Sequence, residues 1–378
     1  MTEPAPSADH VYNVVVVGAG AAGIGVGVAL HHAEVPNVLV VDRHGVGASF
    51  DRWPAETRFI TPSFPTNSIG MLDINSVAIG VSPAFSMKSQ HPTGSDYAEH
   101  LRNVAELFEL PIRPNTDVTR VQKADGLFRL DTNHGTLLAK HVIWAAGEFQ
   151  YPERHPFPGS ELCRHTMTLP SYRVLEGDEF IVIGGYESGI DVAYHLSKWG
   201  KTVRVLDEGR PWEACTSDPS VALSTFSEER MVQSHFAEKV ELIPDAAVVS
   251  VRRDESGYEV KTADGRTMRT DTPPLLATGF SGGHTMVADL FEQRDDGFPL
   301  LTERDESTVT PGIFICGPAV RHDARIFCFL YKYRQRFGIV VKAIATSLGV
   351  DTHAFEEYYR AWGMFLDDFW YFGEECAC

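Results

Sequence analysis

The sequence predicts an α/β fold in which one plan of strand, glycine-rich turn, helix and strand occurs twice. In both places the turn follows an aliphatic, β-branched run, a helix-compatible stretch follows the turn, and the second strand ends in an acidic residue. The 378 residues are enough for two domains at about 150 residues each. Hydrophobic residues make up 43% of the chain, which is ordinary for a protein with large buried cores.

The first unit lies near the N-terminus. Residues 12–17 predict a buried strand, residues 21–34 a helix, and residues 38–41 a second strand that ends in Asp42. Gly18-Ala-Gly20-Ala-Ala-Gly23 joins the first strand to the helix. Gly18 permits the tight turn, Gly20 lets a pyrophosphate approach the backbone, and Gly23 lets the helix pack on the strand. Asp42 is placed to bind a ribose hydroxyl pair, so we predict a dinucleotide site here.

The second unit repeats this plan. Strands are predicted at residues 180–183 and 203–206, with a helix over 190–199 between them and Asp207 after the second strand. The turn reads Gly184-Gly185-Tyr186-Glu187-Ser188-Gly189. Tyr186 stands where the pattern has its middle glycine, so its side chain must point away from the phosphates. Two such units in tandem predict two bound nucleotides, although a degenerate second half is the alternative.

Both units continue in the same way. Strands are predicted at residues 117–122, 127–132 and 137–144 in the first unit, and at 248–252, 258–262 and 275–276 in the second. Each series ends in a bend of small residues, at Gly147 and at Gly279. Each meander therefore returns the chain to its sheet.

Charge and cysteine content limit the function classes. The net charge of −18 disfavours binding to nucleic acid and to anionic membrane surfaces, and no apolar run reaches the roughly 20 residues of a membrane span. The first ten residues are polar and lack a basic region, so no secretory signal is expected. Six cysteines do not make a disulfide framework, and we expect a cytoplasmic protein.

Over about residues 11–350 the chain resembles the flavoproteins with two dinucleotide-binding domains, which include thioredoxin reductases, flavin-containing monooxygenases and bacillithiol disulfide reductases. The resemblance implies two Rossmann-like domains in three layers, FAD at the Gly18 turn, NADPH or NADH at the Gly184 turn, and a homodimer. The Gly-Gly-x-x-Ser-Gly form is most similar to the bacillithiol disulfide reductase group. Residues 310–318 resemble the last FAD-contacting segment, with Gly317 retained and Pro318 where the family has Asp.

The resemblance also implies the domain organisation. Residues 1–155 and 300–355 are expected to form the FAD-binding domain, residues 156–299 the NAD(P)H-binding domain, and residues 356–378 an aromatic C-terminal segment. Residues 50–97, an insertion rich in Pro, Ser, Thr and Phe, are expected to cover the flavin ring or to elaborate the surface. The residues expected to bind the two cofactors are Gly18, Gly20, Gly23, Asp42, Gly147, Gly317, Gly184, Gly185, Ser188, Gly189, Asp207, Arg210 and Gly279.

The electron acceptor must be found elsewhere, because the dithiols of related reductases are missing. No Cys-x-x-Cys occurs in the second unit, and residues 43–56 contain no cysteine. The replacement is the terminal pair Cys376 and Cys378, whose disulfide would close a small, strained and therefore oxidising ring. A packed terminus with two incidental thiols and a soft metal site are the alternatives; we assign no metal.

Further candidate catalytic residues lie in residues 321–329, where the resemblance places the start of a helix aimed at the flavin. His322 is a candidate to protonate a leaving thiolate, or it makes a structural hydrogen bond. Cys328, expected in the first turn of that helix, is a candidate relay between flavin and tail, or it fills the core between Phe327 and Phe329.

These observations predict an FAD-dependent NAD(P)H:disulfide oxidoreductase that acts on a small-molecule disulfide of the bacillithiol, mycothiol or ergothioneine kind. The alternative is a flavin monooxygenase, which residues 157–159 resemble. His165 and Tyr172 lie at the wrong spacing for that family's fingerprint. The coenzyme stays open, because Asp207 favours NADH whereas Arg210 could hold a 2′-phosphate.

Overall fold

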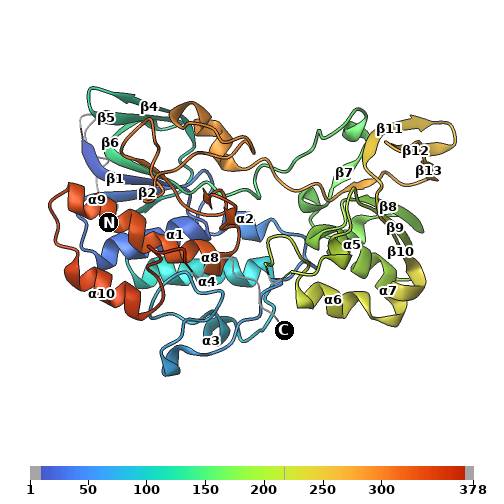
Figure 1. Cartoon of the computed structure of the whole chain (residues 1–378), viewed down its shortest axis with the longest axis horizontal. Helices are drawn as coiled ribbons and strands as arrows, with labels where there is room; N and C mark the ends of the chain where they lie inside the picture. The colour runs from blue at the N-terminus through green and yellow to red at the C-terminus, as the bar shows by residue number, and fades with distance from the viewer. Residues whose placement is uncertain (1–9, 217, 371–378) are drawn as a thin grey trace.

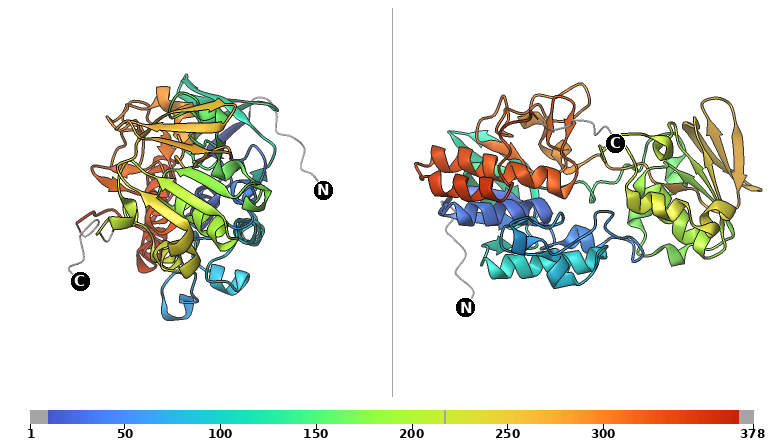
Figure 2. Two further views of the ribbon diagram at one scale, coloured as in Figure 1. Left: turned by 90° about the vertical axis from the view of Figure 1, so that its right-hand side faces the viewer. Right: turned by 60° about the horizontal axis from the view of Figure 1, so that its bottom comes forward.

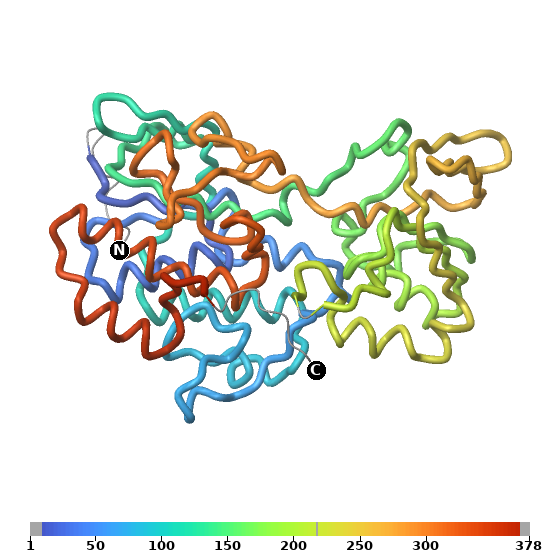
Figure 3. Tube along the Cα trace, viewed as in Figure 1, coloured from blue at the N-terminus to red at the C-terminus, as the bar shows by residue number. Residues whose placement is uncertain are grey.

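The computed structural model describes residues 10–216 and 218–370. It contains two α/β units joined by two connecting segments (Figure 1). These segments run side by side (Figure 3), and an antiparallel bridge joins Pro152 on the first to Phe280 on the second. The predicted fold class is confirmed, and both connections come together between the units.

The first sheet has the order β3-β2-β1-β6-β5-β4, and β15 pairs with the second half of β6. All pairs except β4–β5 and β5–β6 are parallel. Its strands are β1 (Val11–Val17), β2 (Val38–Val41), β3 (Ile112–Arg113), β4 (Val118–Ala124), β5 (Leu127–Thr132), β6 (Gly135–Trp144) and β15 (Ile313–Ile315). Residues 300 onward therefore add their strand to the sheet that the N-terminal residues begin.

The helices of this unit gather on one face of the sheet (Figures 1 and 2). Ten of the twelve residues of α1 are buried, because α4 and α9 pack against it as the sheet covers its other side. A helix that is apolar on every side, as α1 is from Ala21 to Leu30, belongs inside a core. The helices are α1 (Ala21–His32), α2 (Ala48–Asp51), α3 (Pro83–Met87), α4 (Gly94–Leu107), α8 (Leu330–Tyr333), α9 (Phe337–Ser347) and α10 (His353–Ala361).

The second unit has a parallel sheet of order β10-β9-β8-β14-β7 and a separate antiparallel meander, β11-β12-β13. Its strands are β7 (Arg164–His165), β8 (Glu179–Ile183), β9 (Thr202–Leu206), β10 (Val240–Ile243), β11 (Val248–Asp254), β12 (Gly257–Thr262), β13 (Thr267–Thr270) and β14 (Leu275–Leu276). Its helices are α5 (Glu187–Lys198), α6 (Thr225–Met231) and α7 (Ser234–Lys239). The repeated plan is confirmed, except that the second meander forms its own sheet.

None of the described helices is long and apolar enough to cross a membrane.

The buried His100 on α4 makes stability depend on pH. Only 3% of this residue is exposed, and burial lowers the pKa of its imidazole from 6.5 to about 4. The unfolded chain binds this proton more tightly, so the stability that neutral His100 contributes is complete above pH 6.5 and is lost as the pH falls towards 4. At about 1.4 kcal/mol per pKa unit the loss is about 3 kcal/mol.

We therefore expect urea unfolding to show a steep loss of stability between pH 6.5 and 4, and His100→Gln to flatten it. Glutamine keeps a partner for the Ser86 hydroxyl, which lies 2.8 Å from Nδ1 of His100. The matched control is His155→Gln, because His155 is exposed. Equal slopes for wild type and His100→Gln would contradict this assignment.

Candidate functional site

A cavity of about 850 Å³ lies between the two units and is lined by residues of both glycine turns. Gly18 and Gly20 line it from the first turn, and Gly184 and Ser188 from the second. All four follow the carboxyl ends of parallel strands, where open α/β sheets bind their ligands. The fold therefore directs both predicted nucleotide sites into one space.

The first turn is closely packed except at one glycine. Gly18 has φ +111°, and a Cβ atom there would lie 2.3 Å from the Ala145 carbonyl oxygen. A Cβ on Gly23 would lie 1.7 Å from the Gly18 carbonyl oxygen, because helix and strand meet there. Gly20 has no heavy atom within 4 Å of such a Cβ, so the space beside it belongs to the cavity. A diphosphate fits this opening.

Asp42 lies beside this turn and is buried. Its Oδ2 accepts the Ala19 N–H at 2.8 Å, and its Oδ1 accepts the N–H groups of His44 and Gly45, both at 2.8 Å. These bonds hold the carboxylate against the wall of the cavity. A carboxylate has about four lone-pair sites, so Asp42 can still accept a ribose hydroxyl.

The second turn has the same construction. Gly184 has φ +102° and a Cβ there would lie 2.4 Å from the Ala277 carbonyl oxygen, while one on Gly189 would lie 2.0 Å from the Gly184 carbonyl oxygen. Asp207 Oδ2 accepts the Gly185 N–H at 2.6 Å. The Tyr186 hydroxyl donates to the Pro219 and Ala222 carbonyls at 2.5 and 2.8 Å, so its ring is turned towards that loop. Both halves thus fit a dinucleotide.

The three other predicted glycines also have positive φ angles. Gly147 and Gly279 line the cavity, and a Cβ on either would meet no heavy atom within 4 Å. Gly317 follows β15, and its Cβ would lie 3.2 Å from the Ala22 side chain. Pro318, its neighbour, lines the cavity. Their cofactor roles stay predictions, but all three lie at or beside the cavity wall.

The insertion supplies an aromatic wall. Phe50, Trp53 and Phe59 line the cavity, and Phe149 from the first connection completes the group. The Phe50 and Phe59 rings are stacked at 5.7 Å, and the Trp53 and Phe149 rings lie 5.2 Å apart. A planar ring system fits such a wall, so residues 50–59 are well placed to cover a flavin.

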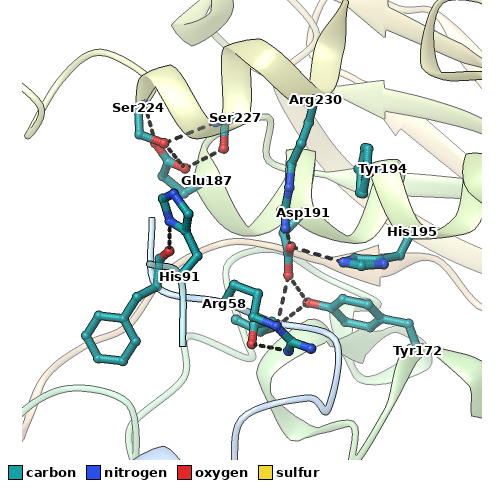
Figure 4. A network of polar contacts seen from close by, with 12 residues as sticks. Arg58, His91, Tyr172, Glu187, Asp191, Tyr194, His195, Ser224, Ser227 and Arg230 are labelled. Atoms are coloured by element: carbon teal, nitrogen blue, oxygen red, sulfur yellow. Dashed lines mark hydrogen bonds and ion pairs between the residues drawn. The ribbon is translucent and has the colours of Figure 1, made fainter. Parts of the chain in front are cut away.

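A polar network joins this insertion to the second unit (Figure 4). Asp191 on α5 accepts Arg230 Nη1 at 2.5 Å, the Thr57 hydroxyl at 2.8 Å and the Tyr172 hydroxyl at 3.0 Å. The His91 and Phe226 rings stack at 4.0 Å between the same units. The sequence analysis missed this network, because its members belong to no motif and meet only in three dimensions.

Glu148 is a second residue that the sequence analysis missed. It follows Gly147 directly, lines the cavity and is half-buried. Burial raises the pKa of its carboxyl to about 7, against the opposing charge of Arg321. Glu148 can therefore hold or release a proton at neutral pH within the cavity. An ionisable residue directly after the small-residue bend was the available signal.

The helix expected over residues 321–329 is absent, which corrects our expectation. Residues in that stretch form a β-hairpin, β16 (Arg321–His322) and β17 (Arg325–Ile326), which turns at Asp323 with φ +52°. Helix α8 begins only at Leu330, so Cys328 precedes it and does not lie in its first turn. Burial raises the pKa of the Cys328 thiol, so the protonated form is favoured at neutral pH and not the expected thiolate.

Cys328 nevertheless lines the cavity. Its Sγ donates to the Ser220 hydroxyl at 3.3 Å, and Lys332 Nζ donates to the same hydroxyl at 2.7 Å. His322 is buried, and its Nε2 lies 2.5 Å from Asp305 Oδ1, which Arg336 also contacts at 2.9 Å. This geometry is that of the structural hydrogen bond, the alternative we left open for His322. His322 does not line the cavity.

Cys376 and Cys378 lie outside the described residues. The last described residues, however, lie close to the hairpin: the Phe369 ring is 5.0 Å from the His322 ring and 6.0 Å from the Phe327 ring. Of the cysteines in the described part, Cys328 alone lines the cavity, whereas Cys163, Cys215 and Cys316 do not. No cluster of metal-ligating side chains occurs within residues 10–216 and 218–370.

Comparison with known proteins agrees with this geometry. The profile of the pyridine nucleotide-disulphide oxidoreductases matches residues 15–317. The "Uncharacterized oxidoreductase CzcO-like" of Geobacillus kaustophilus is 30% identical over 193 residues, which are 50% of this chain and 52% of that protein. The chain spans about half the length of the CzcO-like relatives that it matches.

Two solved structures share the fold over nearly their whole length. Bacillithiol disulfide reductase from Staphylococcus aureus has a TM-score of 0.73 at 18% identity, covering 89% of this chain and 99% of that one. A flavin-containing monooxygenase from Stenotrophomonas maltophilia has a TM-score of 0.69 at 17% identity, covering 89% of this chain and 99% of that one. Both the reductase and the monooxygenase architectures are thus similar to this chain.

Proposed function

Because this chain belongs to the pyridine nucleotide-disulphide oxidoreductase family, whose cofactors are FAD and NAD(P)H, we propose that it reduces a low-molecular-weight disulfide through Cys376 and Cys378. The single observation that carries the proposal is the shared cavity, which is lined by both glycine turns and by Cys328; Phe327, the neighbour of Cys328 in the chain, lies 6.0 Å ring to ring from Phe369, near the end of the described residues. The bound cofactors supply hydride chemistry and pass on an electron pair.

The packing of the last described residues supports this assignment. Five residues lie between Trp370 and Cys376, and an extended chain over these six residue steps spans at most about 20 Å. Phe369 is held against His322 and lies with its ring under Arg325, 5.4 Å from the guanidinium carbon. Phe369 thus packs on the hairpin that precedes Cys328 in the chain.

The proposed sulfur chemistry balances without any further reagent. Two electrons and two protons convert the Cys376–Cys378 disulfide to two thiols. One of these, as thiolate, attacks an external disulfide, forms a mixed disulfide and releases one small thiol. The second cysteine then attacks the mixed disulfide, releases the other small thiol and restores the Cys376–Cys378 bond. Glu148, with a pKa of about 7, is placed to hold a proton in the cavity during this cycle.

Stopped-flow reduction with NADH or NADPH, followed by addition of small-molecule disulfides, tests this function. We expect a bacillithiol-, mycothiol- or ergothioneine-like disulfide to reoxidise the flavin faster than oxygen does. The assignment is wrong if oxygen is faster than every disulfide in the panel.

A flavin monooxygenase is the second candidate. The observation that favours it is the single thiol at the cavity: among the described cysteines only Cys328 lines it, and an oxygenase requires no dithiol. This candidate predicts oxygen uptake in step with consumption of an organic substrate.

A further inference from the structure

We infer that the second nucleotide site selects NADH over NADPH, because Asp207 and Glu208 line the site while Arg210 is already held by two other carboxylates. This inference rests on the proposed function only in placing a pyridine nucleotide at the second glycine turn. It decides between the two coenzymes that the sequence left open.

Asp207 is fixed at the turn by its own backbone bonds. Its Oδ2 accepts the Gly185 N–H at 2.6 Å and its Oδ1 accepts the Gly209 N–H at 2.8 Å. The side chain cannot swing away without leaving both donors unpaired. Its remaining lone pairs face the cavity, where they can accept the 2′- and 3′-hydroxyls of an adenosine ribose.

Glu208 adds a second carboxylate to the same wall. It is exposed and lines the cavity directly after Asp207. A ribose 2′-phosphate carries between one and two negative charges at neutral pH, so two adjacent carboxylates repel it. The same carboxylates are compatible with a free 2′-hydroxyl.

Arg210 was the candidate partner for a 2′-phosphate. Its Nη2 donates to Asp245 Oδ2 at 2.6 Å, and its Nη1 lies 3.4 Å from Glu213 Oε2. Arg210 does not line the cavity. A 2′-phosphate would therefore have to compete with two carboxylates for this guanidinium.

The local balance of charge decides the matter. Glu213 and Asp245 contact the one guanidinium of Arg210, and two more carboxylates, Asp207 and Glu208, lie just before it in the chain and line the cavity. The next cation, Arg266, is bound to Asp264 and to the Pro244 and Asp245 carbonyls. The region that a 2′-phosphate would enter therefore carries net negative charge.

Binding of two coenzyme fragments to the FAD-loaded full chain tests this inference. Isothermal titration with ADP-ribose and with ADP-ribose 2′-phosphate compares the two riboses without any need for turnover. We expect ADP-ribose to bind at least about tenfold more tightly, which is about 1.4 kcal/mol. The ratio should shrink as salt is raised, because the repulsion is screened.

Two variants locate the effect. Asp245→Asn frees Arg210, and Glu208→Gln removes one repelling carboxylate, so each should tighten binding of ADP-ribose 2′-phosphate by about threefold or more. Glu238→Gln is the matched control, because Glu238 is an exposed carboxylate on α7 of the same unit and does not line the cavity. It should leave both affinities within about twofold.

Equal or tighter binding of ADP-ribose 2′-phosphate to the wild type would overturn the inference. So would failure of both fragments to bind, or an equal gain from Glu238→Gln. The proposed function fails separately: if ADP-ribose is preferred but no disulfide is reduced, coenzyme selection stands and the disulfide assignment falls.

Discussion

Replacing Cys376 or Cys378 by serine will lower disulfide turnover by at least about 100-fold, while flavin reduction by the coenzyme stays within about twofold of wild type. Serine cannot form or exchange a disulfide, so the second half of the cycle stops. Hydride transfer from the coenzyme to the flavin requires no thiol, so serine at either position should leave it unchanged. Stopped-flow absorbance of the flavin measures its reduction, and steady-state oxidation of the coenzyme in the presence of the disulfide measures turnover.

Cys215→Ser is the matched control for this loss. Cys215 is an exposed free thiol in the second unit and does not line the cavity, so its replacement should leave both rates unchanged. Cys328→Ser distinguishes a relay role from core packing. If Cys328 is a relay, the variant loses turnover and keeps its melting temperature; if Cys328 only fills the core, the variant keeps turnover and its melting temperature falls. Full turnover in the tail variants would rule out the sulfur route and favour the monooxygenase.

The second prediction with a large expected effect concerns Gly20 and Gly23 of the first turn. Replacing either by alanine should weaken FAD binding, but for different reasons. Gly23→Ala places a Cβ 1.7 Å from the Gly18 carbonyl oxygen, so α1 must move away from β1. We expect this to cost about 3 kcal/mol of folding free energy and to abolish FAD retention, because the turn itself is displaced. Thermal unfolding and the flavin-to-protein ratio of the purified variant measure both losses.

Gly20→Ala should leave the fold intact and still weaken FAD binding. Gly20 has φ −81°, and no heavy atom lies within 4 Å of an added Cβ, so the cost to folding should stay below about 1 kcal/mol. If the open space beside Gly20 holds the cofactor diphosphate, the methyl group meets it and FAD affinity falls about tenfold or more. Unchanged FAD affinity would remove the diphosphate from this position.

Local sequence patterns were sufficient to predict the buried strands and the glycine turns, because both depend on residues that are close together in the chain. The strand at β2 begins and ends where the sequence predicted, at Val38 and Val41. Strands β1 and β8 begin one residue earlier than predicted, at Val11 and Glu179. These strands were predictable because parallel strands buried on both faces read as uninterrupted apolar runs. The glycine turns were predictable because a positive φ angle or a close approach of two backbones tolerates few residues other than glycine.

The family resemblance was misleading at residues 321–329. The resemblance suggested a helix there, but the hairpin β16–β17 forms around Asp323 and helix α8 starts only at Leu330. This difference changes the expected protonation state of Cys328. Cys328 loses the helix N-terminus that would have favoured its thiolate, and burial raises the pKa of the thiol instead.

The sequence by itself determined that two nucleotide-binding units are present and which glycines form their turns, because these features depend on residues close together in the chain. Only the tertiary structure decided that both turns open into one cavity and that Asp191 on α5 binds Thr57 of the insertion. It also decided that Arg210 is held by Asp245. These contacts join residues that are 35 and 134 positions apart in the chain. Contacts between residues so far apart depend on how the whole chain folds, so they leave no periodic pattern in the sequence.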